Sequence, residues 1–102
     1  MGRRISIVAR RLKEARQRAR LSQKRLGILA KMDEFSASAR VNQYERGKHM
    51  PDLQTVKRLA AVLKSPVPYF YCADRQLANL ILKIAPLGRA KKRRLLRLVD
   101  ES

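Results

Sequence analysis

Apolar residues recur at helical spacing along most of the 102-residue chain. Near the N-terminus they fall at Val8, Leu12, Ala15 and Ala19, which places them on one face of a helix. This spacing predicts a first helix over residues 5–20. The opposite face is basic and carries Arg10, Arg11, Lys13, Arg16, Arg18 and Arg20.

Ser22 interrupts this first pattern and is a good N-cap residue for a second helix, predicted over residues 22–31. Residues 31–35 are expected to form a connection, and Asp33 and Ser36 are alternative caps for the helix that follows. The inner face of the second helix is formed by Leu26, Leu29 and Ala30.

A third helix is predicted over residues 36–46 and should end at Gly47, a residue type common just beyond helix C-termini. Its apolar positions Ala37, Val41 and Tyr44 should point inward. The opposite face and its two edges are mostly polar, which fits either a solvated surface of a small helix or a surface that binds a partner. These outward positions are Ser36, Ser38, Ala39, Arg40, Asn42 and Gln43.

A fourth helix, capped by Asp52, is predicted over residues 52–64, and residues 65–68 end it. A short helical turn over 68–72 should bury Tyr69 and Phe70. No segment alternates as a strand would. The inward positions of the fourth helix are Leu53, Val56, Ala60 and Leu63.

The C-terminal part of the chain is predicted to contain two further helices, separated by residues 86–88. The last of them combines apolar positions with a basic run over residues 89–94. The sequence therefore indicates an all-α protein of two parts, residues 1–72 and residues 73–102. The first C-terminal helix carries an apolar stripe at Leu77, Leu80, Ile81 and Ile84.

The net charge of the chain indicates what kind of partner it binds. The chain has 25 Lys and Arg against 8 Asp and Glu, a formal net charge of +17. Such a balance favours a polyanion, above all nucleic acid. An anionic membrane surface is the main competitor, but the basic residues are spread over several helices and the apolar faces have the pattern of a core. No apolar run approaches the roughly 20 residues that span a bilayer, and we expect no membrane partner.

Catalytic, metal and cofactor chemistry is not expected. The acidic residues are scattered, His49 is the one histidine and Cys72 the one cysteine, so no nucleophile–base pair can be named. A single cysteine also excludes an intrachain disulfide and a cysteine-based metal site. The N-terminus lacks the apolar region of a signal peptide. We expect a cytoplasmic, nucleoid-associated protein of prokaryotic or phage origin that is not an enzyme.

Several short motifs together carry a family resemblance. They are Leu21–Gln23, Leu26, Asn42–Lys48 (NQYERGK), Pro51–Leu53, Leu59–Ala60 and Val67–Phe70. In this order and spacing they resemble the Cro/phage-repressor (XRE-like) helix-turn-helix family, over about residues 8–71. The resemblance implies a lambda-repressor-like domain of five helices, whose third helix enters the major groove of DNA.

The resemblance also implies site residues. Gln23 matches a glutamine that bonds a phosphate and braces the recognition helix, and amides such as those of Asn42 and Gln43 can pair with adenine in the major groove. The candidate base-reading residues are Ser36, Ser38, Ala39, Arg40, Asn42 and Gln43. The candidate phosphate-binding residues are Arg10, Gln23, Lys24, Arg46 and Lys48.

One departure from the family concerns the turn before the third helix. Gln23 and Tyr44 are 21 positions apart, about one helical turn more than in typical relatives. Lys31 stands where relatives often have glycine, and lysine disfavours a positive φ. We therefore expect an unusual turn: either a longer loop, or a recognition helix that starts about a turn earlier.

Two functions fit these observations. The first is a sequence-specific regulator of transcription, expected to be a repressor, that dimerises through its C-terminal helices. The stripe of Leu77, Leu80, Ile81 and Ile84 would form the seam, unless it folds back on the domain's own core. The second is an antitoxin-type module, whose C-terminal helices bind a partner protein while the first domain regulates its own operon.

Overall fold

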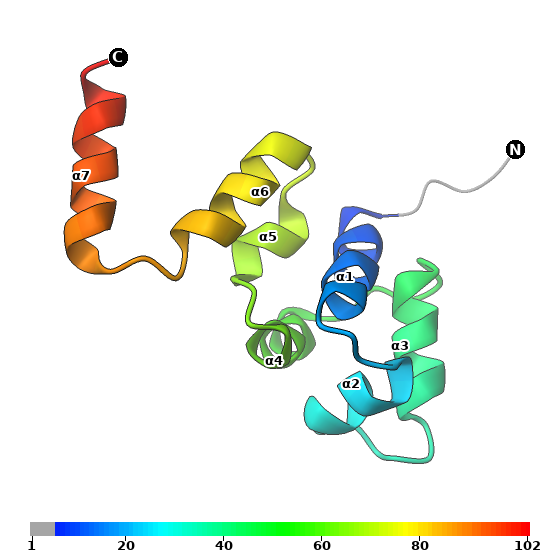
Figure 1. Cartoon of the computed structure of the whole chain (residues 1–102). Coiled ribbons are helices and arrows are strands. Elements are labelled where there is room, and N and C mark those ends of the chain that lie inside the picture. Colours follow the sequence, from blue (N-terminus) through cyan, green and yellow to red (C-terminus); the bar gives the residue numbers. More distant parts are fainter. Residues whose placement is uncertain (1–5) are drawn as a thin grey trace, which may run out of the picture.

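The computed structural model describes residues 6–102, and all regular secondary structure in that range is helical. This confirms the all-α class, with five helices followed by two more. Residue 5, the predicted start of the first helix, lies outside the described residues. The helices, labelled in Figure 1, are α1 (Ile7–Arg18), α2 (Gln23–Leu29), α3 (Ala37–Glu45), α4 (Leu53–Leu63), α5 (Val67–Tyr71), α6 (Arg75–Ile84) and α7 (Arg89–Asp100).

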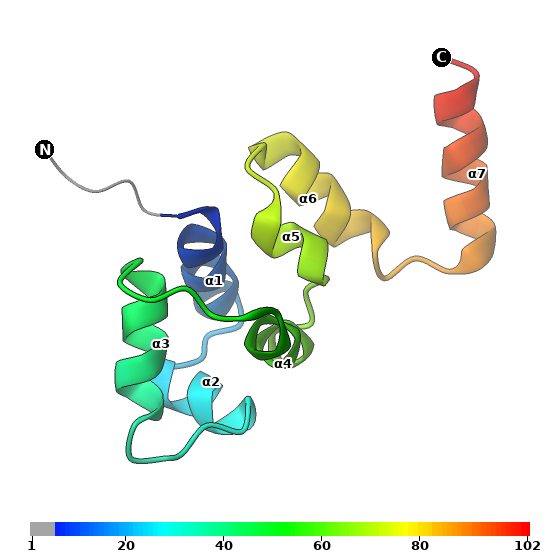
Figure 2. The same ribbon diagram turned by 180° about the vertical axis from the view of Figure 1, so that it is seen from behind.

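Helices α1 to α5 surround one core. The closest pair is α2 and α3, while α1 packs against both α3 and α5, and α4 packs against α2 and α5. Helix α6 packs on α5 and places Ala78 in the core, whereas α7 stands away from the body in both views (Figures 1 and 2) and buries no residue. The division of the chain into two parts, residues 1–72 and residues 73–102, stays a prediction.

The core is aliphatic, with three aromatic side chains. Most positions expected to face inward are buried, but Ala19, Leu29 and Leu53 are exposed. Each lies at a helix end, where the backbone leaves the core although the apolar spacing continues. The core consists of Val8, Leu12, Ala15, Leu26, Ala30, Met32, Ala37, Val41, Tyr44, Val56, Leu59, Ala60, Leu63, Tyr69, Phe70 and Ala78.

Most predicted helix ends are confirmed. The Ser22 hydroxyl accepts a hydrogen bond from the Arg25 N–H at 2.9 Å, and Asp52 accepts one from the Thr55 N–H at 2.8 Å, so both side chains cap their helices. Gly47 follows α3 with φ 74°. Ser36 occupies the N-cap position of α3 but makes no side-chain capping bond.

The connection between α2 and α3 begins in a way that the sequence did not predict. Lys31 adopts φ 70°, so the expectation that lysine would avoid a positive φ here was wrong. Its N–H donates to the carbonyl of Ile28 at 3.0 Å, and the next N–H, of Met32, donates to that of Gly27 at 2.9 Å. These two bonds and the burial of Met32 offset the backbone cost. A longer loop follows, and α3 starts only at Ala37.

The α2–α3 pair crosses closely at Gly27. A Cβ atom at this position would lie 2.6 Å from the Cβ of Ala37 and 3.1 Å from its carbonyl oxygen. The absence of a side chain on Gly27 therefore sets how closely the two helices approach. This contact fixes α3 on the domain, because α2 and α3 are the most extensively packed pair.

Arg11 is buried, although the helical pattern assigned it to the basic outer face. Its guanidinium donates to the carbonyls of Cys72 and Ala73, both at 3.0 Å, and to Glu14 at 2.9 Å. Arg75 of α6 also binds Glu14, at 2.7 Å. Partial burial raises the pKa of Glu14, but hydrogen bonds from Arg75 and Arg11 outweigh it and hold the pKa below its ordinary value. These contacts attach α1 to the α5–α6 link.

Candidate nucleic-acid interface

The outward face of α3 presents short polar and small side chains. Ser38 and Ala39 are exposed, and Asn42 and Gln43 are half-buried. Arg46, which follows the helix, is also exposed and continues the face by helical spacing. Ser36 lies half-buried at the start of the helix. The structure therefore brings most of the candidate base-reading residues to one helical surface, free of the protein's own core.

Arg40 lies on the edge of this surface and is held by an aromatic ring. Its Nη2 donates to the hydroxyl of Tyr44 at 3.0 Å, and its guanidinium carbon lies 6.0 Å from the centre of the Tyr44 ring. Arginine has further N–H donors in a fixed fork, so this contact orients Arg40 without using all of them. Arg40 is the one candidate base reader with an intrahelical side-chain contact of this kind.

Gln23 braces α3 from the first position of α2. Its amide nitrogen donates to the Asn42 side-chain oxygen at 3.2 Å and to the Glu45 carboxylate at 3.1 Å. The oxygen of Asn42 keeps a second lone pair, and its amide nitrogen has no protein partner among residues 6–102. Asn42 is thus fixed in orientation and retains both the donor and the acceptor that adenine recognition requires.

Glu45 is buried at the other side of this network and forms an ion pair with α1. Arg16 Nε lies 2.6 Å from Glu45 Oε2, and Arg16 Nη2 lies 3.0 Å from Oε1, a two-pronged arrangement. The exposed fraction of the side chain is 3% for Glu45 and 14% for Arg16. Arg16 also donates to the carbonyl of Leu21 at 2.9 Å. One guanidinium thus ties α1 to α3 and to the turn before α2.

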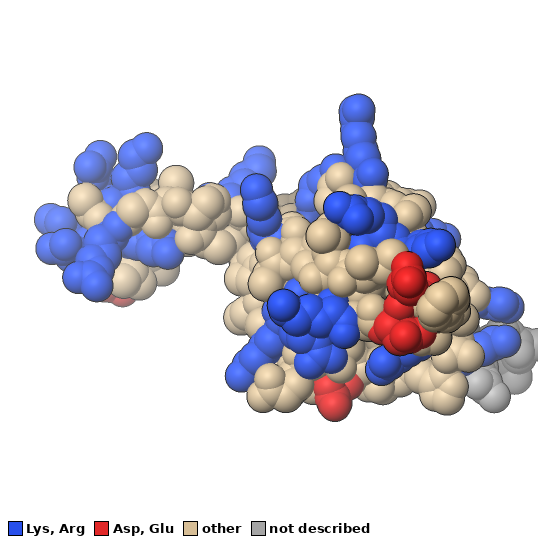
Figure 3. Space-filling model, turned by 90° about the horizontal axis from the view of Figure 1, so that it is seen from below, with Lys and Arg blue, Asp and Glu red and all other residues tan. Residues whose placement is uncertain are grey.

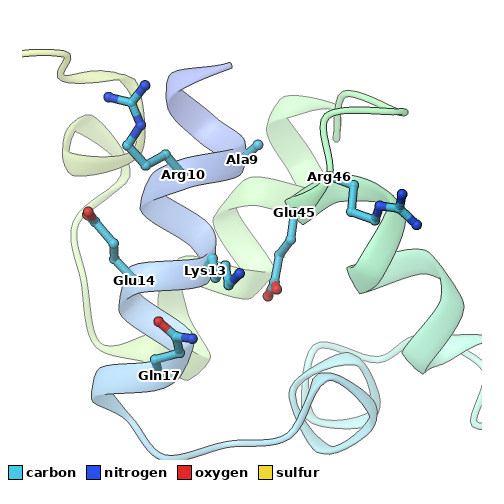
Figure 4. Close-up of a pocket in the computed structure, with 7 residues that line it drawn as sticks. All are labelled: Ala9, Arg10, Lys13, Glu14, Gln17, Glu45 and Arg46. Carbon is cyan, nitrogen blue, oxygen red and sulfur yellow. The ribbon is translucent and has the colours of Figure 1, made fainter. Parts of the chain in front are cut away.

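The basic candidates for phosphate contacts come from α1, α2 and the turn after α3. Lys24 and Lys48 are exposed. Arg10 and Arg46 line one open cleft of about 530 Å³ between α1 and the end of α3, together with Ala9, Lys13, Glu14, Gln17 and Glu45. In Figure 4, Lys13 and Glu45 lie between the two helices, whereas the guanidinium groups of Arg10 and Arg46 point to opposite sides. Arg46 thus belongs to the α3 face, and Arg10 to the outer side of α1.

Lys13 is a further candidate for a phosphate contact, which the sequence pattern did not single out. It lies between α1 and α3 in this cleft (Figure 4), one turn along α1 from Arg10. In the sequence, Lys13 is only one of several basic residues on α1, and nothing in the pattern distinguishes it from the others. More widely, the view from below shows Lys and Arg side chains over both the body and the α7 arm, with a small group of acidic side chains among them (Figure 3).

The stripe proposed as a dimer seam is split in two by the fold. Ile81 packs against the core, and Ile84 is half-buried. Leu77 and Leu80 remain exposed by 52% and 47%. Helix α7 adds a second uncovered apolar face, formed by Leu96, Leu98 and Val99, whose exposed fractions lie between 63% and 67%.

Two further findings on the described residues concern a metal site and a membrane-spanning helix. Within residues 6–102 there is no group of three or more His, Cys, Asp or Glu side chains placed to hold a metal ion. Among the helices of the same range, none combines the length and the apolar character that a membrane-spanning helix needs.

The fold and this surface define a class of protein: a DNA-binding helix-turn-helix protein, with α2 and α3 as the helical pair. The family model described as a helix-turn-helix domain matches residues 7–68, more than half of the chain, and the chain belongs to this family.

A solved structure, entitled "Crystal structure of transcriptional regulator BswR", is similar to this chain, with 51% sequence identity and a TM-score of 0.86. The match covers 92% of this chain and 93% of that one. No curated protein matches the sequence.

Proposed function

We propose that this chain is a sequence-specific regulator of transcription of the Cro/phage-repressor (XRE-like) type, which reads double-stranded DNA by inserting α3 into the major groove. The observation that carries the proposal is the outward amide face of α3, braced by Gln23 rather than covered by the protein. The similarity to a structure described as a transcriptional regulator supports the same conclusion.

The side chains on α3 suit the major groove. Asn42 and Gln43 carry the paired donor and acceptor that match the edge of adenine. Ser36 and Ser38 can bond to several bases, and the methyl group of Ala39 can contact the methyl group of thymine. Arg40, held over Tyr44, can reach a guanine or a phosphate. Repression is the proposed outcome, through binding at a site that overlaps the one used by RNA polymerase.

Selection of duplexes from a random pool tests this proposal. We expect the purified chain to enrich one preferred sequence that contains adenine or thymine positions in each half-site. Binding in which all sequences are retained equally would contradict the proposed function, because phosphate contacts alone carry no sequence information. The chain would then be a general nucleic-acid binder.

The phosphate-binding candidates make a separate prediction. Replacing Lys48 or Arg46 by Gln should weaken binding to every duplex alike. It should also reduce the slope of log affinity against log salt concentration by about 0.9 for each phosphate that the variant no longer binds. Fluorescence anisotropy over a salt series measures the slope. Lys83→Gln, on α6, is the matched control and should leave it unchanged. An unaltered slope for the Lys48 and Arg46 variants would remove both residues from the phosphate contacts. We also assign such contacts to Arg10, to Lys24 and to the backbone N–H of Gln23 at the start of α2, because its side-chain amide already donates to Asn42 and Glu45.

We also propose a homodimer that binds two half-sites about 34 Å apart, one helical turn of DNA. The uncovered leucines of α6 support it, because exposed apolar patches mark association sites. Leu77→Asp combined with Leu80→Asp should give monomers by light scattering. Asn79→Asp changes the charge of the same helix at a position about 100° or more around its axis from both leucines and should leave the dimer intact. A dimer that survives the leucine substitutions would place the seam elsewhere.

A second candidate, the antitoxin-type module, rests on the uncovered apolar face of α7. In that case a different protein covers Leu96, Leu98 and Val99, and the chain alone stays monomeric at micromolar concentration. A dimer in light scattering, abolished by the α6 substitutions, favours the regulator without such a partner. Both functions keep the DNA-binding role of α3 and place the protein with the genome in the cytoplasm.

A further inference from the structure

An aromatic side chain stands alone at the leading end of α3. Phe35 is 91% exposed, the largest exposed fraction among the large hydrophobic residues described. It directly precedes Ser36, the N-cap residue of α3. A single exposed apolar side chain is common on protein surfaces, so the inference rests on where this ring is placed, at the start of α3.

The loop that carries Phe35 is ordered. Met32, at its start, is buried in the core. The N–H of Phe35 donates to the carboxylate of Asp33 at 3.0 Å, and the N–H of Ser36 donates to the carbonyl of Asp33 at 3.1 Å. A side chain of Asp that bonds to the backbone two residues on is a common turn-forming device. The ring is therefore presented from a defined turn.

From this geometry we propose that Phe35 is a specificity-determining residue that contacts the methyl group of a thymine in the major groove. The inference rests on the proposed function of α3. In helix-turn-helix proteins the N-terminal residues of the recognition helix contact base edges, and Phe35 lies just before that end. Apolar side chains, phenylalanine included, recognise thymine through its methyl group, which is the apolar feature of the groove.

The acidic residues beside Phe35 favour a position near the base edges of the major groove over a position near the phosphates. Asp33 and Glu34 precede Phe35 and are exposed. Carboxylates are repelled by phosphates but accept hydrogen bonds from the amino group of cytosine. A loop with this composition therefore fits base edges better than the sugar-phosphate backbone. The longer connection between α2 and α3 thus supplies a contact that a shorter turn would lack.

Uracil substitution tests the proposal, because it removes only the thymine methyl group and keeps base pairing. Each thymine of the duplex selected by the wild-type chain is replaced in turn by uracil, and affinity is measured by anisotropy. We expect the affinity of the wild-type chain to fall about fourfold at one position per half-site, the equivalent of one buried methyl group. Phe35→Ser should bind the thymine and uracil forms of that position equally.

Matched variants separate this contact from others. Tyr71→Ser removes another exposed aromatic residue, on α5, and should keep the wild-type response to uracil. Ala39→Ser tests the other methyl-reading candidate and should also keep the response at the Phe35 position. Phe35→Leu retains an apolar side chain and should show a reduced but measurable response.

Three outcomes overturn the proposal. If no thymine responds to uracil, Phe35 does not read a methyl group, although a preferred sequence from the pool still supports the proposed sequence-specific function. If Phe35→Ser keeps the full response at every position, another residue makes the contact and Phe35 does not read the thymine methyl group. If the pool yields no preferred sequence, the proposed function fails and this inference fails with it.

Discussion

Replacing Arg16 by Met is expected to lower the free energy of unfolding by about 3 kcal/mol, toward the lower end of the range for breaking a buried ion pair. The substitution leaves the Glu45 carboxylate buried, with the Gln23 amide as its one remaining donor among the contacts described. It also frees the carbonyl of Leu21. A domain of this size has a total stability on the order of 5–15 kcal/mol, so urea denaturation should show a large shift of the midpoint.

Two companion variants distinguish the ion pair from a general effect of charge. Arg10→Met removes an exposed arginine from the same helix and should change stability by less than about 0.5 kcal/mol. Adding Glu45→Gln to Arg16→Met removes the uncompensated charge and should restore part of the stability. If the Arg16→Met and Arg10→Met variants unfold at the same urea concentration, the Arg16–Glu45 ion pair does not stabilise the contact between α1 and α3.

Replacing Asn42 or Gln43 by Ala is expected to cost about 1–3 kcal/mol of discrimination between the preferred duplex and one with a changed adenine. Affinity for random DNA should hardly change, because phosphate contacts remain. Asn42→Ala also removes the acceptor of the Gln23 bond and should lower stability by about 1 kcal/mol, whereas Gln43→Ala should not. Competition assays with single-base variants of the duplex measure the discrimination.

Asn79→Ala is the matched control for these two variants, since Asn79 is an exposed amide on α6. It should keep the full preference for the selected duplex. Equal reductions in affinity for specific and random DNA in the α3 variants would show that the two amides hold the helix in place without reading bases.

Local signals in the sequence are sufficient to predict much of this fold. Ser22 and Asp52 are recognisable caps, and Gly47 marks the end of α3. The inward positions of α3 follow from apolar spacing alone, and the amide side chains lie on the opposite face of the same helix. The helices and the polar face of α3 are therefore predictable from residues that lie close together along the chain.

Other features depend on partners that are distant in sequence. Arg11 and Arg16 occupy positions that helical spacing assigns to the basic surface, yet Arg11 binds carbonyls 61 and 62 positions away and Arg16 pairs with a carboxylate 29 positions away. Lys31 adopts a positive φ because tertiary burial of Met32 and two backbone bonds outweigh its own preference. A local pattern contains none of this information.

A double-mutant cycle between protein and DNA measures whether the α3 amides bond directly to bases. One arm replaces Asn42 or Gln43 by Ala, and the other replaces each adenine of the selected duplex by 7-deazaadenine, which lacks the N7 acceptor. We predict a coupling energy of about 1–3 kcal/mol between one amide and one adenine. Effects that add within about 0.5 kcal/mol for every pair would contradict direct bonding of the amides to bases.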